Sequence, residues 1–190
     1  MGYDRILINL IAYPVKVLGP GLRVGIWTQG CSIGCEGCMS LHTWDFDESR
    51  AMSISTVVDQ AASYGSSSIT ISGGEPFQQK NLLLLLKALR SVGFTDIMLY
   101  SGYSEIYIMK HFHVCLSFID VLICEAFIDG LESEAIYKGS DNQKMIVLND
   151  KLISKYDSYM NLNKNKKLQK FDNTVIGIPY QKDIKALYEM

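Results

Sequence analysis

Long hydrophobic runs are absent from this sequence of 190 residues. The longest apolar stretch, Leu82 to Leu86, is far shorter than the roughly 20 residues that a membrane-spanning helix needs. The N-terminal segment is interrupted by Asn9 and Pro14, and it lacks the apolar region and cleavage site of a secretory signal. These absences predict a protein of the cytoplasm that has no membrane partner.

An excess of basic residues is also missing. Lys and Arg number 18 against 20 Asp and Glu, which gives a formal net charge of −2. Nucleic-acid binding requires a clustered basic surface, so no nucleic-acid partner is expected. Paired catalytic carboxylates, a Ser–His–Asp set and a phosphate loop are absent too, so general acid–base catalysis is not the leading mechanism.

What the sequence does contain is an alternation of strand and helix patterns. Such alternation predicts a parallel sheet with helical connections. The units are too few for a closed eight-stranded barrel, so we predict an α/β fold built as a partial, open β/α barrel of about five to six parallel strands. The strands are expected at 22–28, 68–72, 96–100, 121–124 and 144–148, and the helices at about 53–64, 79–92 and 104–112.

The C-terminal part of the sequence has a different character. Residues 151–170 are polar and rich in lysine, and we expect the lysines to be solvated. Two short β-prone segments, 168–171 and 175–178, then flank Asp172-Asn173, which predicts a hairpin turn. We expect a single domain over residues 1–190, with a core at about 14–148 and a tail with a small hairpin at 151–190.

Three of the five cysteines lie close together. Cys31, Cys35 and Cys38 have the spacing Cys-x3-Cys-x2-Cys, and glycines between them allow the backbone to curl so that the thiols converge. An odd number of cysteines argues against a disulfide framework. The other two cysteines, Cys115 and Cys124, are expected in the core.

Three thiolates without a fourth nearby are typical of a reactive metal centre. An ordinary electron-transfer iron–sulfur cluster uses four cysteines, so three ligands leave one iron open. Open coordination likewise separates catalytic zinc from structural zinc. The alternative interpretation of the cysteines is a zinc site that His42 completes.

A second motif follows the expected strand at 68–72. The stretch Ser72-Gly73-Gly74-Glu75-Pro76 begins where that strand ends, and parallel α/β folds bind ligands at this end of their strands. Two glycines allow a ligand to approach the backbone, and Glu75 can accept hydrogen bonds from an ammonium group. Taken alone, the motif also fits a simple turn between a strand and a helix.

Together, the cysteine spacing and the Gly-Gly-Glu-Pro stretch resemble the radical SAM superfamily. The resemblance implies one [4Fe–4S] cluster on Cys31, Cys35 and Cys38, with S-adenosylmethionine (SAM) chelating the open iron. It also implies that Gly73, Gly74 and Glu75 hold the amino end of SAM. One electron from the cluster would split SAM into methionine and a 5′-deoxyadenosyl radical, which abstracts hydrogen from a substrate.

A narrower group is similar over about residues 14 to 148. The stretches 19–21, 28–38, 42–44, 101–103 and 137–143 resemble the activating enzymes of anaerobic (class III) ribonucleotide reductase. This resemblance implies a glycyl radical enzyme as the partner and flavodoxin or ferredoxin as the electron donor. The SAM-binding residues that it implies, together with those of the second motif, are Ser72, Gly73, Gly74, Glu75, Pro76, Ser101, Gly102 and Asn142.

One stretch departs from the pattern of that group. Its members carry an Asp-Gly-Lys run or a similar one where this sequence reads Cys124-Glu125-Ala126-Phe127, without a basic residue. A stand-alone radical SAM enzyme that modifies a peptide or a small molecule therefore remains an alternative. A non-catalytic iron–sulfur or zinc protein is a second one.

Overall fold

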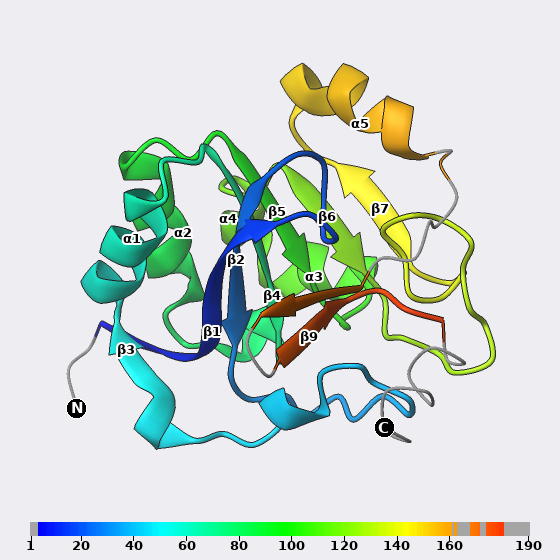
Figure 1. Cartoon of the computed structure of the whole chain (residues 1–190), viewed down its shortest axis with the longest axis horizontal. Helices are drawn as coiled ribbons and strands as arrows, with labels where there is room; N and C mark the ends of the chain where they lie inside the picture. Colours follow the sequence, from blue (N-terminus) through cyan, green and yellow to red (C-terminus); the bar gives the residue numbers. More distant parts are fainter. Residues whose placement is uncertain (1–3, 161, 163–167, 172–173, 181–190) are drawn as a thin grey trace.

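A computed structural model of the chain describes residues 4–160, 162, 168–171 and 174–180. The fold centres on a seven-stranded sheet with the strand order β3-β1-β2-β4-β5-β6-β7 (Figure 1). Strands β2, β4, β5 and β6 are parallel, whereas β3, β1 and β7 join the sheet in antiparallel pairs. The bounds are β1 Arg5–Val15, β2 Arg23–Thr28, β3 Ala51–Ser53, β4 Ser68–Gly73, β5 Asp96–Tyr100, β6 Val121–Cys124 and β7 Lys144–Val147.

The mixed α/β class and a mostly parallel sheet are confirmed, but the expected parallel direction of the strand at 144–148 is wrong. Among the described strands, the neighbours β2, β4, β5 and β6 pair in parallel, whereas β7 runs antiparallel to β6. A parallel neighbour needs a crossover connection, usually a helix. Residues 125–143 form no helix, so the chain turns back at the same edge of the sheet.

Strand β1 was not expected from the sequence. Its pairing with β2 shifts register between Ile8 and Leu10 and again between Ala12 and Val15. Asn9 and Pro14, which interrupt the apolar pattern, lie inside those two irregular steps. Bulges break the two-residue period of a strand, and they therefore hide it from a pattern search.

The helices follow the predicted positions with shorter bounds. Ser53 accepts a hydrogen bond from the Thr56 N–H and begins the first helix, as expected of an N-cap serine. The helix predicted at 79–92 begins at Leu82, because Pro76–Gln78 form a separate 3-10 turn. The helices are α1 Ile54–Ser63, α2 Leu82–Ser91, α3 Glu105–His111, α4 His113–Leu116 and α5 Ile153–Met160. No helix in the described ranges is long and apolar enough to cross a membrane.

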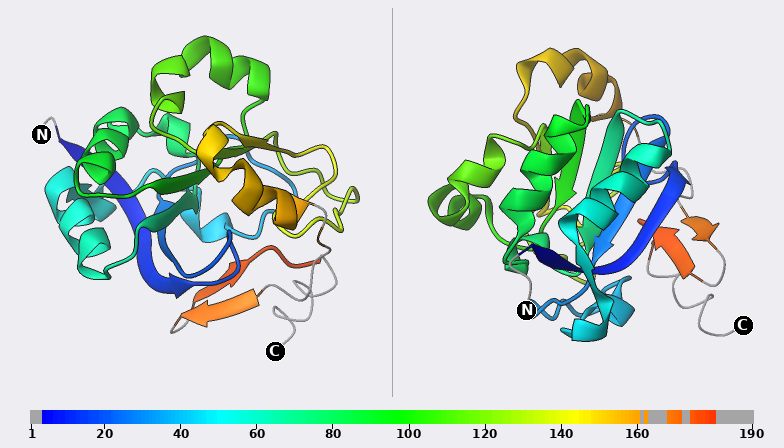
Figure 2. Two further views of the ribbon diagram at one scale, coloured as in Figure 1. Left: turned by 90° about the horizontal axis from the view of Figure 1, so that it is seen from above. Right: turned by 90° about the vertical axis from the view of Figure 1, so that its left-hand side faces the viewer.

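The two faces of the sheet are covered differently (Figure 2). Helices α1 and α2 pack on one face and bury residues such as Val57 and Leu86. The other face, which carries Trp27 and Met98, is covered by a separate hairpin and by Tyr156 of α5. Helix α5 lies in the segment that was expected to be a polar tail.

The C-terminal hairpin is confirmed. It consists of β8 (Leu168–Phe171) and β9 (Thr174–Gly177), which pair antiparallel as a sheet of their own. The expected turn at Asp172-Asn173 falls outside the described residues. Ile176 and Ile178 are buried in the same cluster as Trp27, so the hairpin packs against the main sheet.

Candidate functional site

A pocket opens at the carboxyl ends of β2, β4 and β5. The loop after β2 carries the three cysteines, and the turns Ser72–Glu75 and Tyr100–Gly102 provide neighbouring walls. The register of β2 and β4 pairs Thr28 with Gly73, which brings the first two loops into contact. In Figure 1 the loop after β2 (light blue) lies beyond the tip of that strand, where ligands bind in parallel folds.

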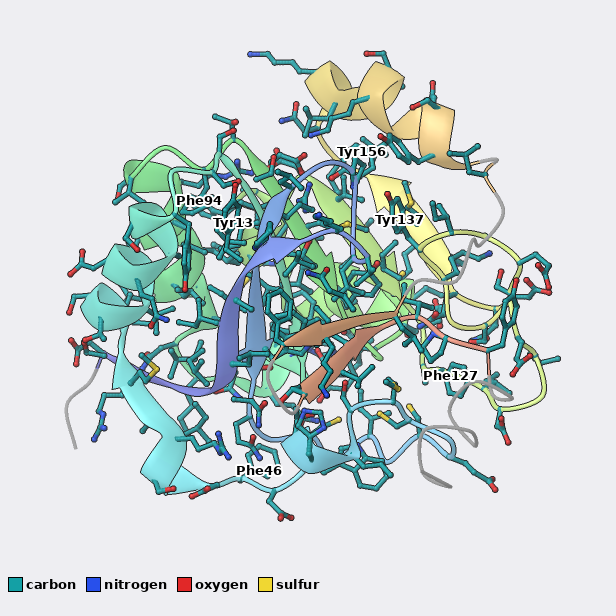
Figure 3. The ribbon with its side chains drawn as sticks, viewed as in Figure 1. Tyr13, Phe46, Phe94, Phe127, Tyr137 and Tyr156 are labelled. Carbon is teal, nitrogen blue, oxygen red and sulfur yellow. The ribbon has the colours of Figure 1, made fainter. Side chains whose placement is uncertain are left out.

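The cysteine loop is held by the backbone of residues that follow it. The N–H groups of Gly30 and Cys31 donate to the carbonyls of Thr43 and Trp44, over 2.7 and 2.9 Å. Gly30 has φ +106°, and a Cβ atom there would stand 2.4 Å from the ring of Phe46. Figure 3 shows Phe46 on this loop and Phe127 on the loop after β6. The glycine therefore allows an aromatic ring to close one side of the loop.

The three cysteines are half-buried and form no disulfide with another described residue, and all of them line the pocket. Burial raises the pKa of the Cys31 thiol and of the Cys35 thiol, and for Cys31 the nearby Glu75 carboxylate adds to the shift. Metal binding at these two residues therefore has to displace a proton.

The two glycines of the second motif allow the loop after β4 to pack closely against the loop after β2. A Cβ atom at Gly73 would lie 2.5 Å from the Thr28 nitrogen, and one at Gly74 would lie 2.3 Å from the Gly30 oxygen. The Gly74 N–H donates to the Thr28 carbonyl over 2.8 Å, and the Glu75 N–H donates to the Gly30 carbonyl over 2.9 Å. Because these glycines have no Cβ atom, the backbone of the cysteine loop can pack directly against them. The sequence predicted only that a ligand would approach them.

Glu75 is a buried carboxylate that faces donors without a full charge. One oxygen accepts from the Ser101 hydroxyl and the Phe77 N–H, over 2.9 and 3.0 Å, and the other accepts from the Gly102 N–H over 2.7 Å. Burial raises its pKa to about 7, although these hydrogen bonds oppose the shift. No Lys, Arg or His of the described chain forms an ion pair with it.

A family model described as "4Fe-4S single cluster domain" matches residues 17–146. The chain is also 32% identical to the anaerobic ribonucleoside-triphosphate reductase-activating protein of Enterobacteria phage T4, over 76% of this chain and 93% of that protein. The chain belongs to this family of activating proteins. It is therefore a radical SAM activase with a single [4Fe–4S] cluster, for which SAM is a substrate.

Other relatives of the activase extend the comparison. The protein of the same name from Vibrio cholerae is 30% identical over 58% of this chain and 78% of its own length. A pyruvate formate-lyase-activating enzyme from Staphylococcus epidermidis is 36% identical over 40% of this chain and 33% of its own length. Among solved structures, QueE from Escherichia coli aligns with a TM-score of 0.46 and 24% identity, over 52% of this chain and 53% of that chain.

Most of the predicted site residues of the activase converge on one pocket. Pro76 does not line it and instead begins the 3-10 turn beside Glu75. Asn142 is not among the residues that line the pocket: its side-chain nitrogen donates to the Ala126 carbonyl over 2.8 Å, its side-chain oxygen is buried without a partner among the described residues, and its neighbour Gln143 lines the pocket. Its contact with SAM stays a prediction. The predicted residues in the wall are Cys31, Cys35, Cys38, Ser72, Gly73, Gly74, Glu75, Ser101 and Gly102.

The zinc interpretation does not fit this arrangement. Although His42 lines the same pocket, no three His, Cys, Asp or Glu side chains within the described ranges are arranged to hold one metal ion. Zinc draws its ligands to about 2.0–2.3 Å from a single ion, whereas each thiolate of a cluster binds a separate iron. The matching family model describes a 4Fe-4S cluster, which favours the cluster over zinc.

The stretch after β6, which has no basic residue, lies beside a lysine of β7. Glu125 follows β6 with φ +80°, a left-handed conformation that is uncommon for a residue with a side chain. Lys144 of β7 lies 2.7 Å from a carboxylate oxygen of Glu105 and 4.0 Å from one of Glu125. The antiparallel pairing of β7 with β6 thus places a cation beside Glu125, outside the pocket wall.

Several pocket residues were missed by the sequence analysis. Leu18, Trp27 and Tyr100 line the pocket from the sheet side, and β9 contributes a wall from the far end of the chain. The hairpin was expected, but nothing in its sequence indicates that it reaches the cysteines. Only the burial of apolar side chains on both faces of the sheet signals that something covers the second face.

Proposed function

We propose that Cys31, Cys35 and Cys38 each bind one iron of the cluster and that the fourth iron receives SAM. The proposal is supported by three free cysteines in one pocket and by the placement of Cys115 and Cys124 in the buried core, away from it. The loop that carries the thiols is fixed by hydrogen bonds to Thr43 and Trp44, so its shape does not depend on the metal alone.

We propose that Gly73, Gly74 and Glu75 hold the amino end of SAM. The observation that carries this assignment is the Glu75 carboxylate, which is buried beside the cysteine loop without a cation from the described chain. A buried charge is normally paired. SAM brings a positive sulfonium group and an amino group that donates hydrogen bonds, so it supplies the partner that the fold leaves out.

The residues around the pocket position SAM and limit solvent. Ser101 and Gly102 fix the Glu75 carboxylate through hydrogen bonds, while Ser72 lines the wall beside them. When bound and reduced, the cluster supplies the electron that splits SAM into methionine and a 5′-deoxyadenosyl radical. Apolar side chains such as Trp27 keep water away from the place where hydrogen is abstracted.

The partner that we propose is the anaerobic ribonucleoside-triphosphate reductase, on which the activase installs a glycyl radical. Support comes from the names of the relatives that match most of their length, those of phage T4 and Vibrio cholerae. We further propose a flavodoxin or a ferredoxin as the electron donor. A location in the cytoplasm is supported by cysteines that remain free thiols.

We also propose that residues 1–190 form one radical SAM domain and that its sheet is a partial β/α barrel with its core at about 14–148. Support comes from the continuous sheet, which runs from Arg5 to Val147. The C-terminal hairpin shares a buried cluster with Trp27, which argues against a second unit.

Anaerobic electron paramagnetic resonance tests the function directly. The reconstituted, reduced activase is mixed with SAM and the host's anaerobic reductase, and 5′-deoxyadenosine is assayed in parallel. A glycyl radical doublet with matching SAM consumption is the expected result. Cleavage of SAM without a doublet would overturn the choice of partner and favour a stand-alone enzyme. A protein without SAM cleavage would contradict the activase function.

A further inference from the structure

The C-terminal hairpin reaches the catalytic pocket. Residues 175–179, at the end of β9 and just after it, line the same cavity as the three cysteines and Glu75. Ile176 and Ile178 are buried against the sheet face that carries Trp27, so this wall is anchored in the core. A segment at the end of the sequence therefore helps to enclose the place where the radical forms.

The two walls of the pocket differ in chemistry. The wall beside the cysteines carries the Glu75 carboxylate and the polar groups of Ser72 and Ser101. The wall formed by β9 is apolar, and Leu18 and Trp27 continue it. The charged end of SAM belongs to the first wall, because an apolar surface offers it no partner.

Hydrogen abstraction requires that the substrate share this cavity with SAM. The polar wall is occupied by the cluster and by the charged end of SAM, so the apolar wall has to cover both the adenosyl end of SAM and the substrate. We propose that β9 and the residues after it receive the glycine-containing segment of the partner as an extended, uncharged peptide. The inference rests on the proposed function, and it assigns the hairpin as the element that determines which peptide is accepted.

One detail of the pocket fits an extended peptide. Gly177 lies within the wall with φ +134°, and a residue without a side chain lets another backbone approach closely.

Substitution of Val175 tests this assignment. Val175 is half-buried, lies in the wall and is outside the buried clusters, so a charge there alters the wall without removing a core residue. We expect Val175→Glu and Val175→Lys each to raise the apparent KM for the reductase about tenfold, because either charge loses hydration when the peptide docks. Glycyl radical formation is measured against reductase concentration, and SAM binding is measured separately by equilibrium dialysis.

Val114→Glu provides the matched control. Val114 is 45% exposed on α4 and does not line the pocket, so we expect the same KM and the same SAM affinity as for the unaltered protein. An unchanged KM in both Val175 variants would overturn the inference while the proposed function stands. The inference would also be overturned if the KM rose in one Val175 variant and fell in the other. A loss of SAM affinity as large as the rise in KM would overturn it too. Failure of the unaltered activase to form the radical would instead refute the proposed function.

Discussion

Two buried carboxylates stand at opposite ends of the parallel strands, and they have opposite surroundings. Asp96 begins β5 and pairs with Arg23, whose two terminal nitrogens lie 2.9 Å from the two carboxylate oxygens. Glu75 follows β4 at the other end and receives only N–H and O–H donors. Asp96 is thus paired within the fold, whereas Glu75 has no ion-pair partner among the described residues.

The pKa values follow this difference. Burial alone would raise the pKa of Asp96, but the hydrogen bonds and charge of Arg23, with help from Lys155 and Tyr156, lower it to about 2. Burial raises the pKa of Glu75 to about 7, since no cation opposes it. The comparison separates two uses of a buried acid: Asp96 joins β2, β5 and α5, whereas Glu75 is a candidate contact for a positively charged ligand.

Loss of a cluster ligand should produce the largest effect, because it abolishes activity at the Glu75 end of the strands and leaves the Asp96 end unchanged. We expect Cys35→Ala to abolish the iron–sulfur absorbance and SAM cleavage, since only three thiols line the pocket. The stability of the metal-free protein should change little, because Cys35 lies on a loop and the polar network around Asp96 is untouched. Absorbance spectra and 5′-deoxyadenosine assays measure the loss. Cys115→Ala is the control, and full cleavage by the Cys35 variant would refute the cluster assignment.

The other end is tested by Arg23→Met. Arg23 is fully buried, and its removal leaves Asp96 with Lys155 as its only cation. We expect a loss of about 3 kcal/mol in the free energy of unfolding, at the lower end of the range for breaking a buried pair. Urea denaturation of the metal-free protein near neutral pH measures it. In the double variant with Asp96→Leu, part of the stability should return, and a loss below about 1 kcal/mol in the single variant would contradict the structural role of the pair.

The sequence predicted local features, such as strand bounds and motifs, better than it predicted the contacts between distant segments. Strands 96–100 and 121–124 have the expected bounds, because each is a run of β-formers between clear turns. The cysteines and the Gly-Gly-Glu stretch were identified from spacing that the chemistry requires. Their meeting in space follows from a general property of parallel sheets, in which successive strands end at one edge.

What the sequence missed depends on contacts between distant segments. The direction of β7 is set by the absence of a crossover helix, and the place of β9 is set by the apolar face that it covers. Asn142 and Gln143 are adjacent, so a motif alone does not indicate which of them lines the pocket. The sequence pattern likewise did not predict the hydrogen bonds that Ser101 and Gly102 donate to the Glu75 carboxylate.

Glu75→Gln tests whether the charge of the unpaired carboxylate contributes to SAM binding. We expect about tenfold weaker SAM binding with intact cluster absorbance, because a charge-assisted contact becomes neutral. In the unaltered protein, SAM affinity should rise as the pH passes upward through about 7, where Glu75 loses its proton. The variant should lack this rise. Equilibrium dialysis at several pH values measures both effects, and loss of the cluster colour would mean that Glu75 is structural.

The same shift predicts how stability depends on pH without SAM. The folded state keeps the Glu75 proton up to about pH 7, whereas the unfolded chain releases it near its ordinary pKa of 4.5. Stability should therefore fall as the pH rises from about 4.5 to about 7, and Glu75→Gln should remove this fall. Asp96 acts in the opposite direction: its contribution is present above 3.8 and is lost as the pH falls toward about 2.

The smallest effect is expected from the two tyrosines that face the hairpin side of the sheet. The Tyr156 hydroxyl donates to Asp96 over 2.7 Å, so Tyr156→Phe should cost about 1.5 kcal/mol, as for a hydrogen bond to a charged group. The Tyr100 hydroxyl has no partner among the described residues, and its removal leaves no group unsatisfied. Tyr100→Phe should therefore leave the free energy of unfolding unchanged or raise it by up to about 1 kcal/mol without ligands, because a buried polar group without a partner is removed. Urea denaturation measures both, and an equal loss in the two variants would show that the Tyr100 hydroxyl is already bonded in the free protein.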